Sequence, residues 1–161
     1  HQDLTGAEPL VDLFDAAWPL HTRPGPSMPT RFGQGTGAVP ARVCSSLVCG
    51  AGRIDADVVN RSVLSPGVQL GAGSVVEHSV VLPGAVLGRR VVLRRAIVDE
   101  GCVLPDGLSV GVSADEDRAR FHVTAGGVTL VTAQMLQRAA PPRALAVPAP
   151  RPTARLAALQ R

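Results

Sequence analysis

One feature constrains the fold of this chain more than any other: between Ser62 and Gly111, a large aliphatic residue recurs about every six positions. A second residue, small or β-branched in all but the last case, lies two positions before each large one. The large residues are Leu64, Leu70, Val76, Val81, Leu87, Leu93, Val98, Leu104 and Val110. Their partners are Ser62, Val68, Ser74, Ser79, Ala85, Val91, Ala96, Cys102 and Leu108. Such a short internal repeat indicates a solenoid, in which each coil covers the one before it.

The spacing also predicts how each unit is built. Positions two apart on a strand point to the same side, so each unit sends one large and one small side chain inward. Glycines between the pairs supply corners, because glycine adopts positive φ without a steric clash. Three units close one triangular coil. We therefore expect an all-β solenoid, and we reject a β-sandwich because sandwich strands do not keep a period of six through this many repeats.

Three weaker units extend the repeat toward the amino terminus and bring it to about twelve units, or roughly four coils. Their large residues are Val48, Ile54 and Val58, preceded by Ser46, Gly52 and Ala56.

The flanking segments have different compositions, which divide the chain into residues 1–42, 43–138 and 139–161. In the first segment we expect a short amphipathic helix over residues 1–20 and then an extended linker rich in Gly, Pro, Ser and Thr. After Gly111 we expect a polar loop, a capping hairpin and one or two helical turns to residue 138. The last segment carries five prolines among Ala and Arg, which predicts disorder.

Charge and cysteine content exclude several classes of protein. The net charge of +3 comes from the last segment, because the other residues carry 12 basic and 13 acidic side chains. We therefore expect no nucleic-acid-binding body. Cys44, Cys49 and Cys102 are odd in number and lack C-x-x-C spacing, which favours buried thiols in a reducing cytoplasm over a disulfide framework or metal site. The sequence shows no membrane span or secretory leader.

Several segments, in unbroken order, resemble the carboxyl-terminal part of bacterial ADP-glucose pyrophosphorylase (glucose-1-phosphate adenylyltransferase). The resemblance covers about residues 3–138, and its most specific parts are the Trp-Pro start and the Asp-Glu-Asp-x-x-Arg-Phe exit. The matching segments are residues 10–15, 18–20, 46–48, 62–67, 94–99, 115–121 and 127–132.

The resemblance implies a left-handed parallel β-helix that holds subunits together, as a homotetramer, and helps to bind a sugar-phosphate effector. The family makes ADP-glucose and pyrophosphate from ATP and glucose 1-phosphate, with Mg²⁺, for glycogen or starch synthesis. Its catalytic domain has a Gly-rich loop and acidic metal ligands, and no such phosphate cradle can be drawn here. The chain also begins with His1. We therefore expect a fragment that is inactive alone, with no cofactor and with neither catalytic nor metal-binding residues.

The effector site implied by the resemblance is altered in this chain. Enterobacterial relatives place basic residues at positions that match Glu100, Ala133 and Gln137. None of these three is basic, so we expect a weak response to fructose 1,6-bisphosphate and a stronger response to a monophosphate such as glucose 6-phosphate or fructose 6-phosphate.

Three arginines are our candidates for binding the effector: Arg94, Arg95 and Arg138. Arginine suits phosphate through its forked guanidinium group. Arg94 and Arg95 are adjacent, so on a strand they point in opposite directions, and at most one can join a given site. Other nearby cations are Arg89, Arg90, Arg118 and Arg120.

Hexapeptide repeats also occur in proteins of other functions. A hexapeptide acyltransferase needs a histidine base at a subunit groove, and only His78 is suitably placed, although a solvated histidine is the commoner explanation. A zinc site like that of γ-carbonic anhydrase needs three histidines, and His78 has no companion in the repeat. The same module in another sugar nucleotidyltransferase stays open.

Overall fold

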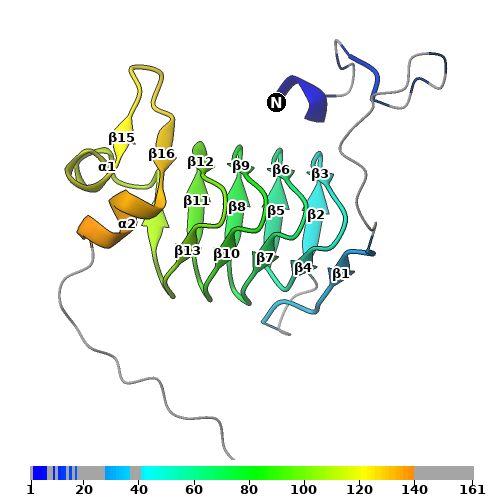
Figure 1. Cartoon of the computed structure of the whole chain (residues 1–161), viewed down its shortest axis with the longest axis horizontal. Coiled ribbons are helices and arrows are strands. Elements are labelled where there is room, and N and C mark those ends of the chain that lie inside the picture. The colour runs from blue at the N-terminus through cyan, green and yellow to red at the C-terminus, as the bar shows by residue number, and fades with distance from the viewer. Residues whose placement is uncertain are drawn as a thin grey trace, which may run out of the picture.

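The structure, a computed structural model, describes residues 2–6, 9, 11–13, 15, 17, 28–36 and 41–139. Its body is a left-handed parallel β-helix of about four coils, whose short strands form three sheets, A, B and C (Figure 1). Sheet A contains β1 (Arg31–Phe32), β4 (Arg53–Ile54), β7 (Gln69–Leu70), β10 (Val86–Leu87) and β13 (Val103–Leu104). Sheet B contains β2 (Arg42–Cys44), β5 (Val58–Asn60), β8 (Val75–Glu77), β11 (Val92–Arg94) and β14 (Ser109–Val110). Sheet C contains β3 (Leu47–Val48), β6 (Val63–Leu64), β9 (Val80–Val81), β12 (Ala96–Val98), β16 (Thr129–Val131) and β15 (His122–Val123).

The core confirms the predicted repeat. All nine large residues from Leu64 to Val110 are at most 2% exposed, and their nine partners are buried as well. Each large residue lies beside its equivalent in the next coil, as Leu70 does beside Leu87 and Leu87 beside Leu104. The hydrophobic interior is therefore made of stacked columns of aliphatic side chains, each removed from water by the coils on either side.

In one of the three weaker units, the predicted inward residue is wrong by one position. The buried residue of β5 is Val59, fully buried and aligned with Val76, whereas Val58 is only half-buried. The reason is a shorter corner between sheets A and B in this coil. Five positions separate Ile54 from Val59, where six separate Leu70 from Val76.

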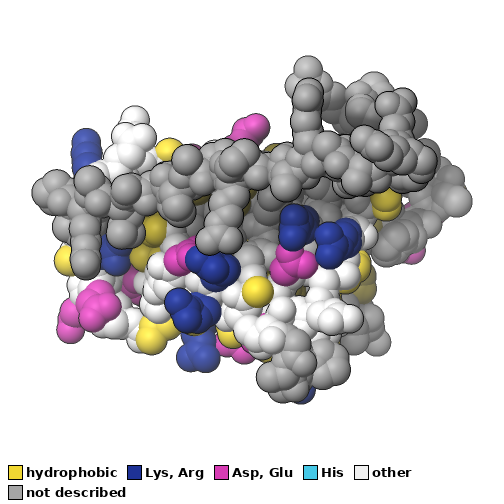
Figure 2. Space-filling model, turned by 90° about the horizontal axis from the view of Figure 1, so that it is seen from below, with side chains coloured by type: hydrophobic (Ala, Val, Ile, Leu, Met, Phe, Trp, Pro, Cys, Tyr) yellow, Lys and Arg dark blue, Asp and Glu magenta, His cyan; other side chains and the backbone are white. Residues whose placement is uncertain are grey.

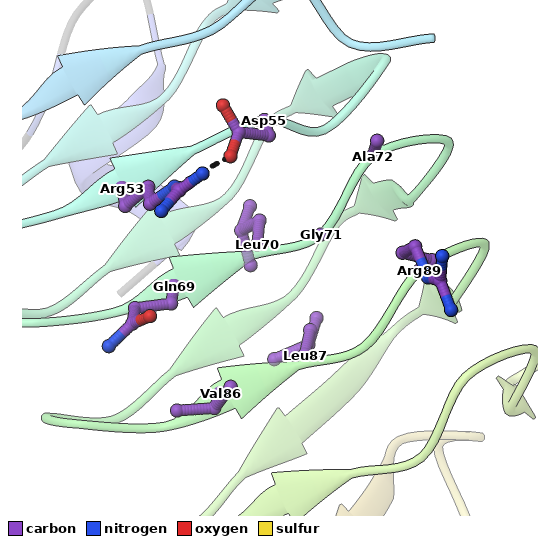
Figure 3. Close-up of a pocket in the computed structure, with 9 residues that line it drawn as sticks. All are labelled: Arg53, Asp55, Gln69, Leu70, Gly71, Ala72, Val86, Leu87 and Arg89. Atoms are coloured by element: carbon purple, nitrogen blue, oxygen red, sulfur yellow. Dashed lines mark hydrogen bonds and ion pairs between the residues drawn. The ribbon is translucent and has the colours of Figure 1, made fainter. Parts of the chain in front are cut away.

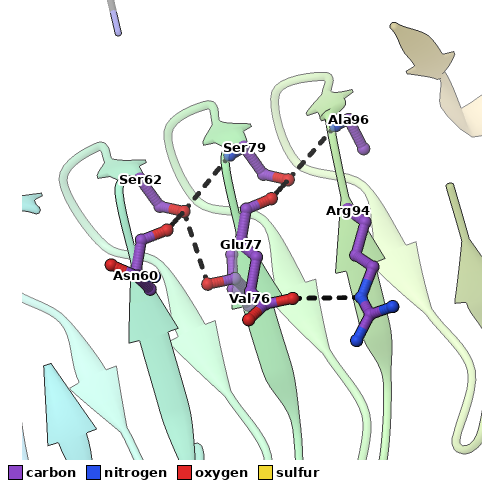
Figure 4. Close-up of polar contacts among 7 residues, drawn as sticks. All are labelled: Asn60, Ser62, Val76, Glu77, Ser79, Arg94 and Ala96. Atoms are coloured by element: carbon purple, nitrogen blue, oxygen red, sulfur yellow. Dashed lines mark hydrogen bonds and ion pairs between the residues drawn. The ribbon is translucent and has the colours of Figure 1, made fainter. Parts of the chain in front are cut away.

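The corner between sheets B and C explains why several of the small inward residues are serines. A single residue with φ of +45° to +50° makes this corner in successive coils, as His78 and Arg95 do. The backbone N–H that follows the corner donates to a serine hydroxyl of the preceding coil: Ser79 to Ser62 at 3.2 Å, and Ala96 to Ser79 at 3.1 Å (Figure 4). The serines thus satisfy buried donors that a purely apolar column would leave unpaired.

The expected amino-terminal helix is much reduced. Among the described residues of this segment, helical structure is limited to a 3-10 turn, η1 (Gln2–Thr5), and residues 11–13, 15 and 17 are not helical. Short helices depend on packing against other elements, and Val11 remains 41% exposed.

Part of the expected linker is a paired strand. β1 adds to the edge of sheet A, where the Arg31 N–H donates to the Gly52 carbonyl at 2.9 Å and the Gly33 N–H donates to Ile54 at 2.8 Å. Residues 21–27 and 37–40 of this linker lie outside the described residues.

The far end of the solenoid is closed by helices and a hairpin. The expected polar loop is instead α1 (Ala114–Arg120), whose first turn carries three acidic residues, a favourable arrangement for the helix dipole. The predicted hairpin is confirmed: β15 runs antiparallel to β16, and β16 extends sheet C beside β12. The last predicted helical turns are α2 (Ala133–Ala139). The predicted disordered segment, residues 139–161, lies outside the described residues except for Ala139.

Candidate functional site

The three positions that the resemblance relates to effector binding come together at one end of sheet C. Val98 of β12 pairs with Val131 of β16 in parallel, so Glu100 and Ala133, two residues further along, leave the sheet at the same end. Gln137 lies four residues after Ala133 on α2, which places both on one face of that helix. All three are exposed. We call Glu100, Ala133 and Gln137 the sheet C end surface; Figure 1 shows α2 directly after β16.

The charges near this surface are mixed. Glu100 is exposed, and its backbone N–H donates to the Asp99 carboxylate at 2.9 Å. Arg138, one of the predicted site residues, follows Gln137 in the last turn of α2 and is exposed. An anion at this surface would therefore meet the Glu100 carboxylate, and Arg138 would have to reach it from a neighbouring face of α2.

Arg94 lies elsewhere and has a partner. It ends β11 in sheet B, and its Nε donates to Glu77 Oε2 at 3.0 Å (Figure 4). The two side chains are 53% and 29% exposed, so solvent screens the ion pair, which contributes about 1 kcal/mol or less to stability. Its positive charge is largely balanced where it stands.

Arg95 is not on a strand, so the prediction that it points opposite to Arg94 across a strand does not apply. It makes the corner between sheets B and C with φ of +50°, and its Nη2 donates to the Gly126 carbonyl at 2.7 Å. Arg95 precedes β12, whereas Glu100 follows it. Arg94 and Arg95 therefore lie at the end of sheet C where β12 begins. Helix α2, which carries Arg138, begins at the opposite end of that sheet.

The remaining candidates for chemistry are scattered. His78 is half-buried at a corner. Cys102 is buried as expected, and burial, with a smaller effect of the Asp99 charge, raises the pKa of its thiol. The prediction of buried thiols is wrong for Cys44 and Cys49, which lie in the first coil and are exposed.

The part of the chain that the structure describes contains neither a metal-binding cluster nor a membrane-spanning helix. No group of three or more His, Cys, Asp or Glu side chains is arranged to hold a metal ion there. In those same ranges, no helix has both the length and the apolar character that crossing a bilayer requires.

A groove on the outer face of sheet A was not predicted. Its volume is about 340 Å³, and its lining includes Arg53, Asp55, Gln69, Ala72 and Arg89 (Figure 3). No sequence motif marks it, because these residues belong to three different coils and meet only through the register of β4, β7 and β10.

Comparison with known proteins gives a consistent result. A family model described as GlmU-like, C-terminal hexapeptide matches residues 28–131. The chain is 39% identical over 136 residues to a glucose-1-phosphate adenylyltransferase of Yersinia pseudotuberculosis serotype O:1b (strain IP 31758). It is 44% identical over 135 residues to the protein of that name from Albidiferax ferrireducens and 41% identical over 133 residues to the one from Parafrankia sp..

These matches cover most of this chain but a minority of each relative. They include 84%, 84% and 81% of the chain and 32% of each of the three relatives. The chain therefore spans about a third of the length of the curated relatives that it matches, and it corresponds to their carboxyl-terminal hexapeptide part.

Proposed function

The chain belongs to the family of GlmU-like, C-terminal hexapeptide domains, and we propose that it is the regulatory and oligomerisation module of a glucose-1-phosphate adenylyltransferase. The parent enzyme would join ATP and glucose 1-phosphate into ADP-glucose and pyrophosphate in the cytoplasm, with Mg²⁺ bound by a separate catalytic domain. Identities of 39–44% to proteins of that name support the proposal. The module's partners would be that catalytic domain and sister subunits in a homotetramer.

The observation that carries the regulatory role is the sheet C end surface. Glu100 and Ala133 lie at the same end of paired parallel strands, and Gln137 shares a helix face with Ala133. The resemblance implies that these positions face an effector bound between the two domains. Their convergence from separate segments of the sequence supports a shared site rather than three unrelated substitutions.

The side chains on this surface favour an effector of low charge. A bisphosphate needs cations from both domains, and Glu100 presents a negative charge where relatives are basic. Each missing charge-assisted hydrogen bond lowers binding by about 1.5–3 kcal/mol, or one to two decades of affinity. A monophosphate needs fewer cations, and Arg138 is this surface's own candidate. Arg94 and Arg95 lie at the other end of sheet C, so they could bind a phosphate only at a different site.

The test is the rate of ADP-glucose synthesis by the intact enzyme that contains this chain. Glucose 6-phosphate or fructose 6-phosphate should activate it more strongly than fructose 1,6-bisphosphate at equal concentration. The chain alone, prepared free of host enzyme, should make no ADP-glucose above a boiled control. Turnover by the chain alone would contradict its assignment as a non-catalytic module, and stronger activation by the bisphosphate would contradict the proposed effector class.

A further inference from the structure

The groove on sheet A lies where the strands turn toward sheet B. Arg53 and Asp55 form one wall and are joined by an ion pair of 2.8 Å between Nε and Oδ2. Gln69 and Val86 contribute to the floor, and Ala72 and Arg89 stand at the corner side (Figure 3). Figure 2 views the molecule from the side on which Figure 1 places β4, β7 and β10, and basic and acidic side chains alternate across it.

Elsewhere along this corner, the repeat supplies a carboxylate to a backbone N–H of a neighbouring coil. Asp106 Oδ1 accepts from the Arg89 N–H at 2.8 Å, and Asp57 Oδ1 accepts from the Thr36 N–H at 2.9 Å. Each contact joins the side chain of one coil to the corner backbone of the coil before it. Carboxylates therefore bind two backbone donors of this corner, at different positions of the repeat: Arg89 lies two residues after Leu87, whereas Thr36 lies four residues after Phe32.

In the described part of the chain, the backbone N–H of Ala72 has no such carboxylate partner. The register pairs Leu70 with Leu87 and Leu87 with Leu104, so Arg89 stands next to Ala72 just as Asp106 stands next to Arg89. Arginine has only donors and cannot accept the Ala72 N–H. Among the described residues, none accepts a hydrogen bond from that N–H, whereas the adjacent Gly73 N–H donates to Asp57 Oδ1 at 3.3 Å.

The two arginines of the groove also have donors to spare. Arg53 uses its Nε on Asp55, and Arg89 uses its Nε and Nη2 on Asp106 Oδ2. A guanidinium group carries five N–H donors, so both retain several for another acceptor. Their side chains are 60% and 73% exposed, which leaves them free to turn toward a ligand.

We propose that this groove binds a small carboxylate anion, whose carboxylate occupies at the Ala72 corner the place that the Asp106 carboxylate occupies at the next one. The anion accepts the Ala72 N–H and pairs with the Arg89 guanidinium, both charge-assisted contacts. Its remaining atoms lie over Gln69 and Val86. A volume of about 340 Å³ limits the ligand to a small molecule. The site is separate from the sheet C end surface.

The test is an amide NMR titration of the full 161-residue chain with sodium butyrate, beside 1-butanol, inorganic phosphate and sodium chloride at matched ionic strength. The Ala72 and Gln69 amide signals should move in a saturable manner with butyrate. They should stay in place with butanol, which has the same tail and no charge. Unmoved signals with butyrate, equal movement with butanol, or saturation with phosphate alone would each overturn the carboxylate assignment.

Three variants locate the binding. Ala72→Pro removes the donor, and proline already occupies comparable corner positions at Pro66 and Pro83. Arg89→Asn supplies a side-chain oxygen to the Ala72 N–H and removes the charge. Each should weaken butyrate binding about tenfold or more. Arg90→Gln is the matched control, because it removes a neighbouring charge that does not line the groove, and it should bind as the natural chain does. Unchanged binding in Arg89→Asn, whose fold the same spectra check, would overturn the proposal.

Discussion

The hydroxyl of Ser79 joins two coils: it accepts the backbone N–H of Ala96 at 3.1 Å and donates to the Glu77 carbonyl at 2.7 Å. Ser79 is 1% exposed, so water cannot replace either contact. The hydroxyl column ends at Ala96, which needs no hydroxyl of its own. The next strand, β16, returns from the hairpin, and its Thr129 N–H donates directly to the Arg95 carbonyl at 3.0 Å.

Ser79→Ala should therefore destabilise the chain. The change leaves the buried Ala96 N–H without an acceptor, which costs about 1–3 kcal/mol in the free energy of unfolding. Ser65→Ala is the control, since Ser65 is half-buried at an outward corner and should change stability by less than about 0.5 kcal/mol. Chemical denaturation gives both values, and equal stability of the two variants would show that the hydroxyl column contributes nothing.

The corrected register of β5 predicts a difference between two adjacent valines. Val59→Ala removes buried methyl groups beside Val76 and should cost about 2 kcal/mol, while Val58→Ala should cost clearly less. The pair changes the same atoms on opposite faces of one strand, so the comparison does not depend on intrinsic strand preference. A larger loss for Val58→Ala would restore the register predicted from the sequence.

A glycine pair tests how closely the end of the last coil packs on the coil before it. Gly111 has φ of +78°, and a Cβ there would overlap the Arg94 carbonyl oxygen. Gly111→Ala should cost at least about 1–2 kcal/mol from the backbone conformation alone, and more from the overlap. A Cβ at Gly126 would contact only Thr124 Oγ1, at 4.0 Å, so Gly126→Ala should hardly change the free energy of unfolding. Melting temperatures that fall equally for both variants would contradict the described geometry at Gly111.

The contact between Arg89 and Asp106 predicts a pH dependence. The Arg89 backbone N–H, then its guanidinium, lowers the pKa of the Asp106 carboxyl below its ordinary value. Because the pKa of Asp106 is lower in the folded chain than in the unfolded chain, the contact stabilises the fold fully at a pH above the unfolded-state pKa. This stabilisation is lost as the pH falls through the folded-state pKa. Carboxyl NMR should show that the pKa of Asp106 lies below the ordinary aspartate value. Arg89→Gln removes the guanidinium and keeps the backbone N–H, so it should raise that pKa only part of the way back. An unshifted Asp106 in the natural chain would contradict the contact.

The repeat made the core predictable. If the spacing of the inward residues changed without a compensating change in a corner, the side chains that follow would face solvent. The same reasoning wrongly assigned Val58 as the inward residue. The corner before β5 is shorter by one residue, and the sequence does not reveal this because Val58 and Val59 are both valines. It overlooked β1, whose pairing to β4 depends on backbone groups rather than on side-chain pattern. It treated residues 115–117 as a loop, although three carboxylates also favour a helix start.

The candidate sites were less predictable than the core. The resemblance named Glu100, Ala133 and Gln137, but only the pairing of β12 with β16 brings them to one end of a sheet. The sequence alone did not separate Arg94 and Arg95 from Arg138, because strand direction and the corner at Arg95 decide which end of sheet C each one occupies. The groove near Ala72 arises from register alone.

The most direct test of the regulatory role is the fructose 1,6-bisphosphate concentration that half-activates the intact enzyme, before and after Glu100→Arg. The change replaces a repelling carboxylate with a donor, so the half-activating concentration should fall by one to two decades. Val103→Arg adds a positive charge at an exposed position of sheet A and should leave that concentration unchanged. Potent activation of the natural enzyme by the bisphosphate, with the same half-activating concentration in Glu100→Arg, would contradict the assignment of the sheet C end surface to effector binding.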